Sequence, residues 1–136
     1  METCQHERQR RDGPSRDRHE DPRSVLGDAH VDAAQKKRTE FDSDFQDWIT
    51  GSAWNDVWGR PGLSKRERSM ITIAILASLG QWDEVAMHTR ATLNTGATRD
   101  DLREVMFHVA VYAGVPAANH AIKVIKQVFA DLDAAK

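Results

Sequence analysis

The stretch SKRERSMITIAILASLG, residues 64–80, decides the fold. Its first serine and the glutamate three residues later match a capping box, in which each side chain bonds the backbone amide of the other residue. The ten residues from Met70 to Leu79 are apolar nearly all round, so we expect neighbouring helices to enclose this helix. A membrane-spanning helix needs about 20 apolar residues. We therefore expect a buried helix that ends at Gly80 and no association with a membrane.

The chain on both sides of this segment also has helical patterns. A helix from about residue 81 to 95 should stop at Gly96, a usual left-handed cap. Thr98 should cap the next helix, and Pro116 sits in the first turn of a last one. Upstream, residues 31–40 and 42–57 form two amphipathic segments that end before the turn at 60–62. Because no alternating run suits a strand, the sequence predicts an all-α, compact bundle of about six helices.

Composition indicates one domain with a tail. The chain has 136 residues, 40% hydrophobic and 29% charged, which fits a single globular domain. Residues 1–23 contain six arginines, six acidic residues and no aromatic residue, so they cannot bury enough surface to offset the entropy of ordering. We expect a disordered polar tail at 1–23 and a folded domain at 24–136.

Charge and cysteine content exclude some partners. The net charge of -2 provides no basic excess for a phosphate backbone, so we expect no nucleic-acid partner. The one cysteine, Cys4, can form neither an intramolecular disulfide nor a thiolate metal site. A reducing, cytoplasmic location is the natural interpretation.

One pair on the helix after Gly80 could carry chemistry. Glu84 and His88 are four residues apart, so their side chains share a face, and the carboxylate can orient the imidazole. A plain surface ion pair is the simpler explanation of this spacing. A metal site is less favoured, because the paired Glu-x-x-His pattern of carboxylate-bridged bundles is absent. His108 and His120 are expected at the surface or at an interface.

Arginines gather around the turn before the capping box. Arg66 and Arg68 lie in the first helical turn, where the helix dipole does not favour a cation, and Arg60 follows Trp58 in the turn itself. A nearby anion would account for them, either an acidic protein partner or the carboxylates of a substrate. The tryptophans are expected mainly in the core or at a subunit interface.

Four segments together resemble the carboxymuconolactone decarboxylase family, within the alkylhydroperoxidase-D-like superfamily. They cover residues 26–133 in the order and spacing of the family. The segments are VLGDAHVD from Val25, WNDVWGRPGLSKRERSMITIA from Trp54, the Glu84-x-x-x-His88-x-Arg90-Ala91 helix with Asn94-x-Gly96, and YAGVPAANHA from Tyr112.

The chain departs from the redox branch of that superfamily. That branch places Cys-x-x-Cys-x-x-x-His on the active helix and a glutamate on the helix before it. Gln81 and Glu84 stand in the cysteine positions here, and Ser69 stands in place of the glutamate. Peroxidase chemistry needs an active and a resolving thiol, so we expect none.

The resemblance implies a carboxy-lyase that works without cofactor or metal. Its branch decarboxylates 4-carboxymuconolactone to beta-ketoadipate enol-lactone in protocatechuate catabolism, and the small-molecule substrate is a dicarboxylate lactone. On this basis we expect His88 to deliver a proton and Glu84 to set its tautomer. The expected substrate-binding residues are Arg60 and Arg68 for the carboxylates, Tyr112, Asn119 or His30 for the lactone oxygen, and Trp58.

The resemblance also implies homo-oligomers, often ring-like hexamers. An alternative from a different class is a catalytically silent helical scaffold of the same fold, which would use its aromatic segment only for oligomerisation.

Overall fold

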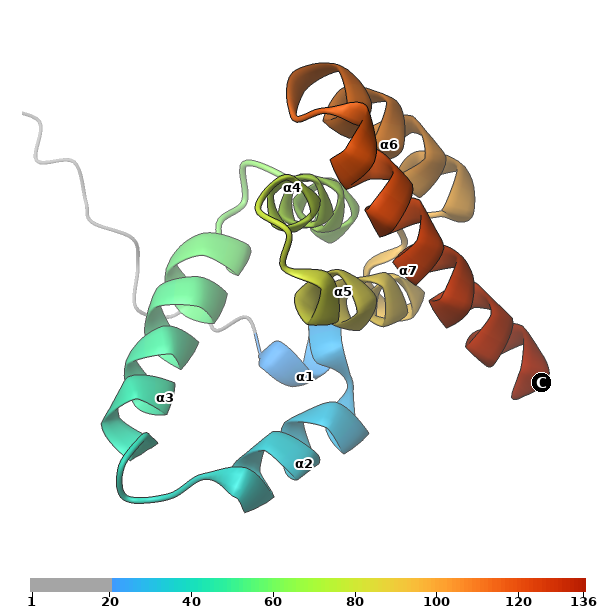
Figure 1. The fold of residues 1–136 in the computed structure, drawn as a ribbon. Helices are drawn as coiled ribbons and strands as arrows, with labels where there is room; N and C mark the ends of the chain where they lie inside the picture. The colour runs from blue at the N-terminus through green and yellow to red at the C-terminus, as the bar shows by residue number, and fades with distance from the viewer. Residues whose placement is uncertain (1–20) are drawn as a thin grey trace, which may run out of the picture.

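The computed structural model describes residues 21–136, and within that range every regular element is helical (Figure 1). The expected polar tail lies outside the described residues as far as position 20, and Asp21–Arg23 form the cap and first turn of the first helix. The elements are α1 (Pro22–Leu26), α2 (Asp28–Lys37), α3 (Ser43–Ile49), η1 (Thr50–Trp58), α4 (Lys65–Ser78), α5 (Trp82–Thr95), α6 (Arg99–Tyr112) and α7 (Val115–Ala134). The all-α prediction is confirmed, with seven α-helices and one π-helix in this range where about six helices were expected.

Helices α4 to α7 form the bundle and share one apolar core. α4 packs along α5, and α6 packs along α7. The two pairs also meet, because α5 contacts α7 and α4 contacts both α6 and α7. The residues of this core are Ile73, Ala77, Val85, Leu102, Val105, Met106, Val109, Ala118, Ala121 and Ile125. Four of them, Leu102, Val105, Met106 and Val109, recur at helical spacing and form the buried face of α6.

The predicted helix ends are where the sequence placed them. Ser64 and Glu67 form the capping box of α4, and Thr98 and Asp101 form a second box at the start of α6. Gly96 ends α5 at a φ of 83°, in the left-handed region that glycine adopts without steric cost. These local signals mark the starts of α4 and α6 and the end of α5.

α4 is only half enclosed. Ile73 and Ala77 are completely buried, whereas Ile71, Ile75 and Leu79 on the opposite side are 45%, 53% and 67% exposed. The expectation of enclosure on all sides is wrong within one chain, because the packing of α5, α6 and α7 on α4 leaves Ile71, Ile75 and Leu79 uncovered.

The first helix makes a second, smaller cluster against α5. Val25 is completely buried and packs with Trp58 and Ala91. Asn94 on α5 donates a 2.9 Å hydrogen bond from its side-chain nitrogen to the carbonyl of Val25. Through these contacts α1 holds the N-terminal part of the chain against the bundle.

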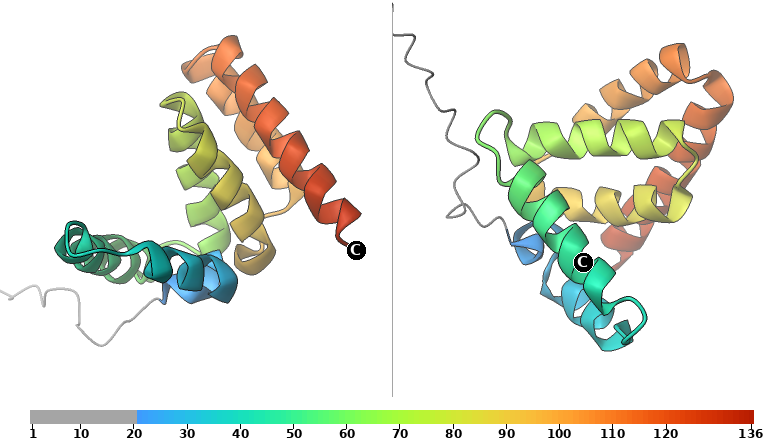
Figure 2. Two further views of the ribbon diagram at one scale, coloured as in Figure 1. Left: turned by 60° about the horizontal axis from the view of Figure 1, so that its bottom comes forward. Right: turned by 90° about the vertical axis from the view of Figure 1, so that its left-hand side faces the viewer.

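Residues 28–58, which comprise α2, α3 and η1, form an arm that stands away from the bundle. Figures 1 and 2 show it on the opposite side of α4 and α5 from α6 and α7. The two segments expected at 31–40 and 42–57 are helical, but α2 ends at Lys37, and the second changes from α-helix to π-helix at Thr50. α3 has no buried residue and continues directly into η1.

Within residues 21–136, no helix combines the length and the apolar character that crossing a bilayer requires.

Candidate active site

His88 lies on α5 at the point where the end of η1 reaches the bundle. Its imidazole is 8% exposed and stacks on the ring of Trp58, with 6.3 Å between ring centroids and 14° between planes. The Nδ1 atom is buried and has no hydrogen-bond partner. Because a buried imidazole nitrogen normally has a partner, this atom is available to a ligand.

The surroundings of His88 hold its imidazole in the neutral form. The pKa of His88 is lowered to about 4, chiefly by burial and also by the charge of His30, while the charge of Glu84 acts in the opposite direction. A buried imidazole loses the hydration that stabilises its cation. In the free protein at pH 7, His88 is therefore neutral.

Arg68 brings a buried cation to the same end of η1. Its Nη2 atom donates a 2.8 Å hydrogen bond to the backbone carbonyl of Arg60, two residues after Trp58. Its Nε atom is buried and has no partner. A buried guanidinium with a free donor favours a carboxylate, which accepts from arginine with planar, charge-assisted geometry.

These two atoms are the buried side-chain nitrogens or oxygens that lack a partner in the described part of the chain. Both belong to residues that contact the last residues of η1 and the turn after it, Trp58 through ring stacking and Arg60 through its carbonyl. The arrangement offers one cation, on Arg68, and one neutral imidazole, on His88, beside the ring of Trp58, which we call the aromatic wall.

Trp54 extends that aromatic wall, and the sequence interpretation did not include it among the site residues. Its ring lies 5.5 Å from that of Trp58, and both side chains pack on the cluster of Val25 and Ala91. The signal was present in the sequence, because residues four apart on a helix share a face.

Three other expected residues lie near this site but act less directly than predicted. Glu84 is exposed and makes no hydrogen bond to the Nδ1 atom of His88, so it reaches the imidazole only through its charge. His30 is also exposed and also acts through charge. Arg60 is exposed and contributes its backbone carbonyl to Arg68.

Tyr112 and Asn119 are not part of the cluster around His88. Tyr112 is 84% exposed at the end of α6, where it stacks with His108, 6.1 Å between centroids. Asn119 lines a groove between α6 and α7. A single chain therefore does not bring Tyr112 and Asn119 to His88, where their expected role at the lactone oxygen would require them.

Arg66 forms an ion pair within the chain. Its Nε and Nη2 atoms donate bonds of 2.7 and 2.6 Å to the two carboxylate oxygens of Asp101. This contact links the start of α4 to the start of α6 and holds the pKa of Asp101 well below its usual range. Arg66 is thus structural, and Arg68 is the arginine of this helix that is left for a ligand.

His120 stacks on Trp82, with 3.9 Å between ring centroids, and both His108 and His120 are exposed as expected. Among residues 21–136, no three or more histidine, cysteine or acidic side chains come together as a metal-ligand group.

The fold and the site define a small helical protein in which Trp58 of η1, Arg68 of α4 and His88 of α5 come together where the end of η1 and the turn after it reach the bundle. The chain belongs to the carboxymuconolactone decarboxylase family, which it matches over residues 43–127. That range begins at α3 and ends within α7, and it includes Trp58, Arg68 and His88.

Two relatives with assigned activities agree with this membership. The chain is 46% identical over 108 residues to a 4-carboxymuconolactone decarboxylase of Acinetobacter baylyi, covering 79% of this chain and 81% of the relative. It is 36% identical over 110 residues to a nitrosuccinic acid decarboxylase of Metarhizium robertsii, covering 81% and 77%. Both relatives carry names that describe the loss of a carboxylate.

Proposed function

We propose that this chain is a carboxy-lyase that converts 4-carboxymuconolactone to beta-ketoadipate enol-lactone in protocatechuate catabolism. The observation that carries the proposal is the pair of unpartnered buried atoms, Nδ1 of His88 and Nε of Arg68, beside Trp58 in a chain of this family. The similarity to the Acinetobacter baylyi enzyme supports the choice of substrate.

The substrate supplies its own electron sink. It is an unsaturated lactone with a carboxylate on the ring carbon gamma to the lactone carbonyl and a second carboxylate on an acetate arm. When the ring carboxylate leaves as carbon dioxide, the electron pair of the broken C–C bond passes through the double bond into the lactone carbonyl. One proton added at the alpha carbon then gives the enol-lactone, so each turnover consumes one proton.

In this proposal Arg68 binds a carboxylate of the substrate through its free Nε atom, and its Nη2 atom stays on the carbonyl of Arg60. The bond to that carbonyl fixes the orientation of the guanidinium before substrate arrives. Preorganised charge of this kind stabilises negative charge without reorganisation during the reaction.

His88 acts as the proton donor and is charged by the substrate itself. The imidazole is neutral in the free protein because burial lowers its pKa to about 4. A dianion bound beside it raises that pKa, because an opposite charge favours the protonated form. His88 then takes a proton from solvent and delivers it to carbon as a general acid.

The aromatic wall of Trp58 and Trp54 gives the site an apolar side. A carboxylate placed against that wall loses hydration, and its departure as neutral carbon dioxide relieves the loss. We assign the departing carboxylate to this side and the acetate arm to Arg68. Tyr112, Asn119 and His30 remain candidates for the lactone oxygen.

We further propose that the protein works in the cytoplasm as a homo-oligomer, with a hexamer as the expected assembly. One cysteine in 136 residues supports a reducing compartment. Several large apolar side chains are more than half exposed in the single chain, including Phe107 and Leu79, which supports burial against other copies.

The proposal is tested by adding the lactone to the purified full chain in the presence of a chelator and following its loss. His88→Gln should lower kcat by about a hundredfold or more, which is the usual scale for a general acid, and His108→Gln should not. Absence of turnover by the folded wild-type chain would favour the silent scaffold. Faster turnover of nitrosuccinic acid than of the lactone would reassign the substrate within the same chemistry.

A further inference from the structure

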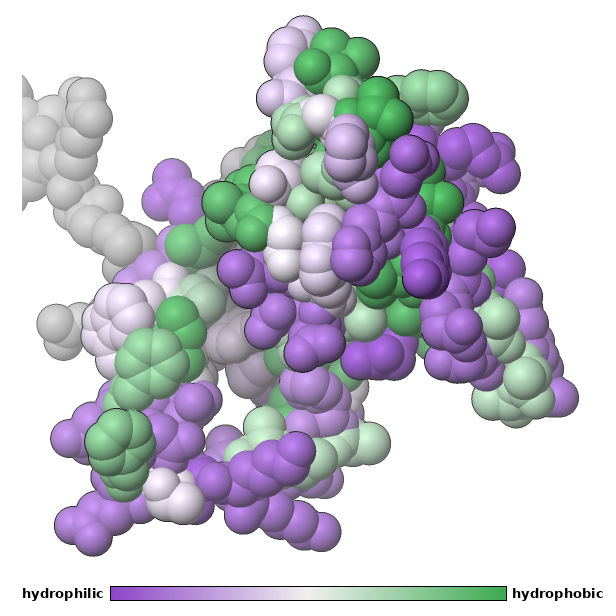
Figure 3. Space-filling model, viewed as in Figure 1, coloured by the Kyte–Doolittle hydropathy of each residue, from purple (hydrophilic) through white to green (hydrophobic). Residues whose placement is uncertain are grey.

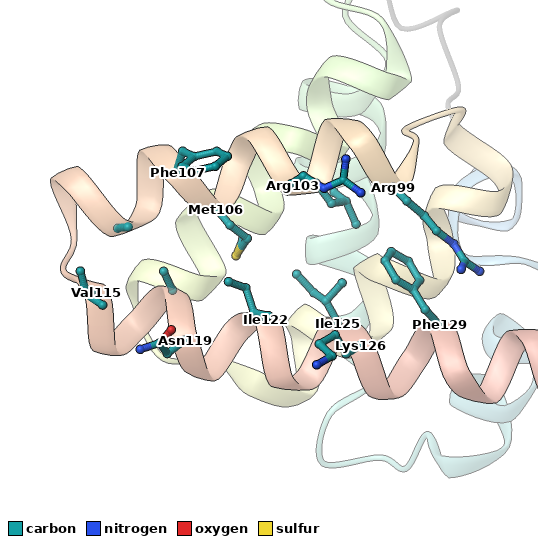
Figure 4. Close-up of a pocket in the computed structure, with 13 residues that line it drawn as sticks. Arg99, Arg103, Met106, Phe107, Val115, Asn119, Ile122, Ile125, Lys126 and Phe129 are labelled. Atoms are coloured by element: carbon teal, nitrogen blue, oxygen red, sulfur yellow. The ribbon is translucent and has the colours of Figure 1, made fainter.

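An apolar groove with a basic rim runs between α6 and α7. Its volume is about 430 Å³, and its floor includes Met106, Ile122 and Phe129 (Figure 4). Arg103 and Lys126 lie along its edges. Phe107 and Ile122 are 62% and 39% exposed there, so the apolar surface is open in the single chain. A soluble chain normally covers a continuous apolar surface of this kind.

The arm carries a complementary surface. Phe41, Phe45 and Trp48 are 100%, 57% and 62% exposed. Phe41 lies in the turn before α3, and Phe45 and Trp48 share a face of α3 with 6.0 Å between their ring centroids. Four acidic residues lie between and beside them, namely Glu40, Asp42, Asp44 and Asp47, of which Asp42 accepts from Thr39 and Asp47 pairs with Arg38. An amphipathic helix that lays such a stripe into an apolar groove is a recurrent mode of protein recognition.

The arm cannot lie in the groove of its own chain. Figures 1 and 2 place the arm and the α6–α7 pair on opposite sides of α4 and α5. Figure 3 shows hydrophobic surface on the arm at the lower left and around the α6–α7 hairpin at the top. With seven residues and none buried, α3 also lacks the packing that normally stabilises a short helix. Both surfaces therefore require a second molecule.

We propose that residues 40–48 of one copy lie in the α6–α7 groove of a second copy. This inference rests on the self-association proposed above and names its surfaces. The aromatic side chains contact the groove floor, and the acidic side chains face Lys126 on its edge. Because two different surfaces meet, the contact is head-to-tail, and repetition of such a contact closes into a ring.

The charges favour the arm of a second copy, rather than the α6–α7 groove of a second copy, as the partner of this groove. Two α6–α7 grooves placed face to face would bring their basic rims together, and like charges across an interface oppose association. The acidic arm removes that repulsion. Arg99 and Arg103 add less to the attraction than Lys126, because Asp133 and Asp100 already bind them at 2.6 and 2.7 Å. Arg99 also lies over the ring of Phe129.

The contact would also reach the candidate site. The arm continues from Trp48 through η1 to Trp58, whose ring stacks on His88. Fixing the outer end of the arm on a neighbour therefore restrains the helix that carries the aromatic wall. We expect turnover per chain to fall when the oligomer dissociates.

The test is the size of the full-length chain in sedimentation velocity over a range of concentrations. Trp48→Ser in the arm and Phe107→Ser in the groove should each raise the dissociation constant by about thirtyfold or more, the effect of removing an interface hot spot. Leu93→Ser is the matched control, because Leu93 is 71% exposed on α5 and belongs to neither surface. Since all three side chains are exposed, circular dichroism should show unchanged helix content.

Mixing the two variants gives the sharper result. Trp48→Ser keeps an intact groove and Phe107→Ser keeps an intact arm, so an equimolar mixture should recover heterodimers that neither variant forms alone. Failure of the mixture to associate would overturn the arm-in-groove contact. So would an oligomer that persists in both variants but dissociates on Ile75→Ser, which would locate the interface on α4. A wild-type chain that is monomeric at every concentration would refute self-association itself.

Discussion

The buried imidazole of His88 predicts a specific loss of stability in mild acid. Its pKa is about 4 in the folded chain, against an ordinary value of 6.5. Between these values the unfolded chain binds a proton that the folded chain does not, so the free energy of unfolding falls as pH decreases. Relative to pH 7, linkage gives a loss of about 2 kcal/mol at pH 5 and about 3 kcal/mol at pH 4.

His88→Gln removes this titration and leaves the other groups in place. Asp101, Asp133 and Glu67 also have lowered pKa values, so they stabilise the fold at neutral pH and lose that effect below their ordinary range near pH 4. Their contributions are common to both proteins and cancel in the difference between them.

The measurement is urea unfolding, followed by far-ultraviolet circular dichroism, of wild type and His88→Gln at pH 7, 5 and 4. The stability of wild type should fall more steeply than that of the variant, by the amounts given above. Parallel pH profiles for the two proteins would refute the buried neutral imidazole. An imidazole proton resonance of His88 that titrates near 6.5 would do the same.

Three further predictions concern a charge, a cap and the core. Arg68→Met should raise the KM for the lactone by about tenfold or more, as expected for loss of a charge-assisted hydrogen bond. The control Arg90→Met, at an exposed position of α5, should leave KM unchanged. An unchanged KM in Arg68→Met would make Arg68 purely structural. Thr98→Ala removes the capping box of α6 and should destabilise the chain by about 1 kcal/mol in urea unfolding. Ser78→Ala, at an exposed position of α4, is the control and should not have this effect. Equal stability of the two variants would count against the cap. Leu102→Ala, at a side chain that is 1% exposed, should lower the free energy of unfolding by about 2 to 5 kcal/mol. Leu93→Ala at the surface should change it by less than about 0.5 kcal/mol. A small loss for Leu102→Ala would mean that the core collapses around the gap.

The bundle was predictable because its signals are local. The cap at Ser64, the left-handed Gly96 and the proline at the start of α7 each depend on a few neighbouring residues, and the structure has all three. The apolar stripe of α6 is likewise a property of one helix. Signals of this kind can be identified without knowing which helices meet.

The candidate site was less predictable because its contacts join distant parts of the chain. The ion pair of Arg66 with Asp101 spans 35 residues, and it removes Arg66 from the set of candidate ligands for an anion. The stacking of Trp58 on His88 depends on how η1 meets α5. The spacing of Glu84 and His88 predicted that the carboxylate orients the imidazole, but Glu84 is exposed to solvent while His88 is buried and its Nδ1 atom has no partner.

The arm shows a different limit of sequence analysis. Its helical pattern was visible, but nothing in residues 50–58 distinguishes a π-helix from an α-helix by composition. The exposure of Phe41 and Trp48 was also hidden, because an apolar stripe in a sequence does not say whether its partner belongs to the same chain.

The π-helix at Thr50–Trp58 has a consequence for how this protein can vary in length. A π-helix holds one more residue in each hydrogen-bonded turn than an α-helix does. Because the extra residue is taken up within the segment, deleting one residue from it can return the segment to α-helix while the residues after it keep roughly their direction around the helix axis. Trp58 would then still face His88 in a chain that is one residue shorter. In the evolution of this chain, η1 can therefore absorb the loss of one residue, a change that would turn every later side chain by about 100° in a regular α-helix.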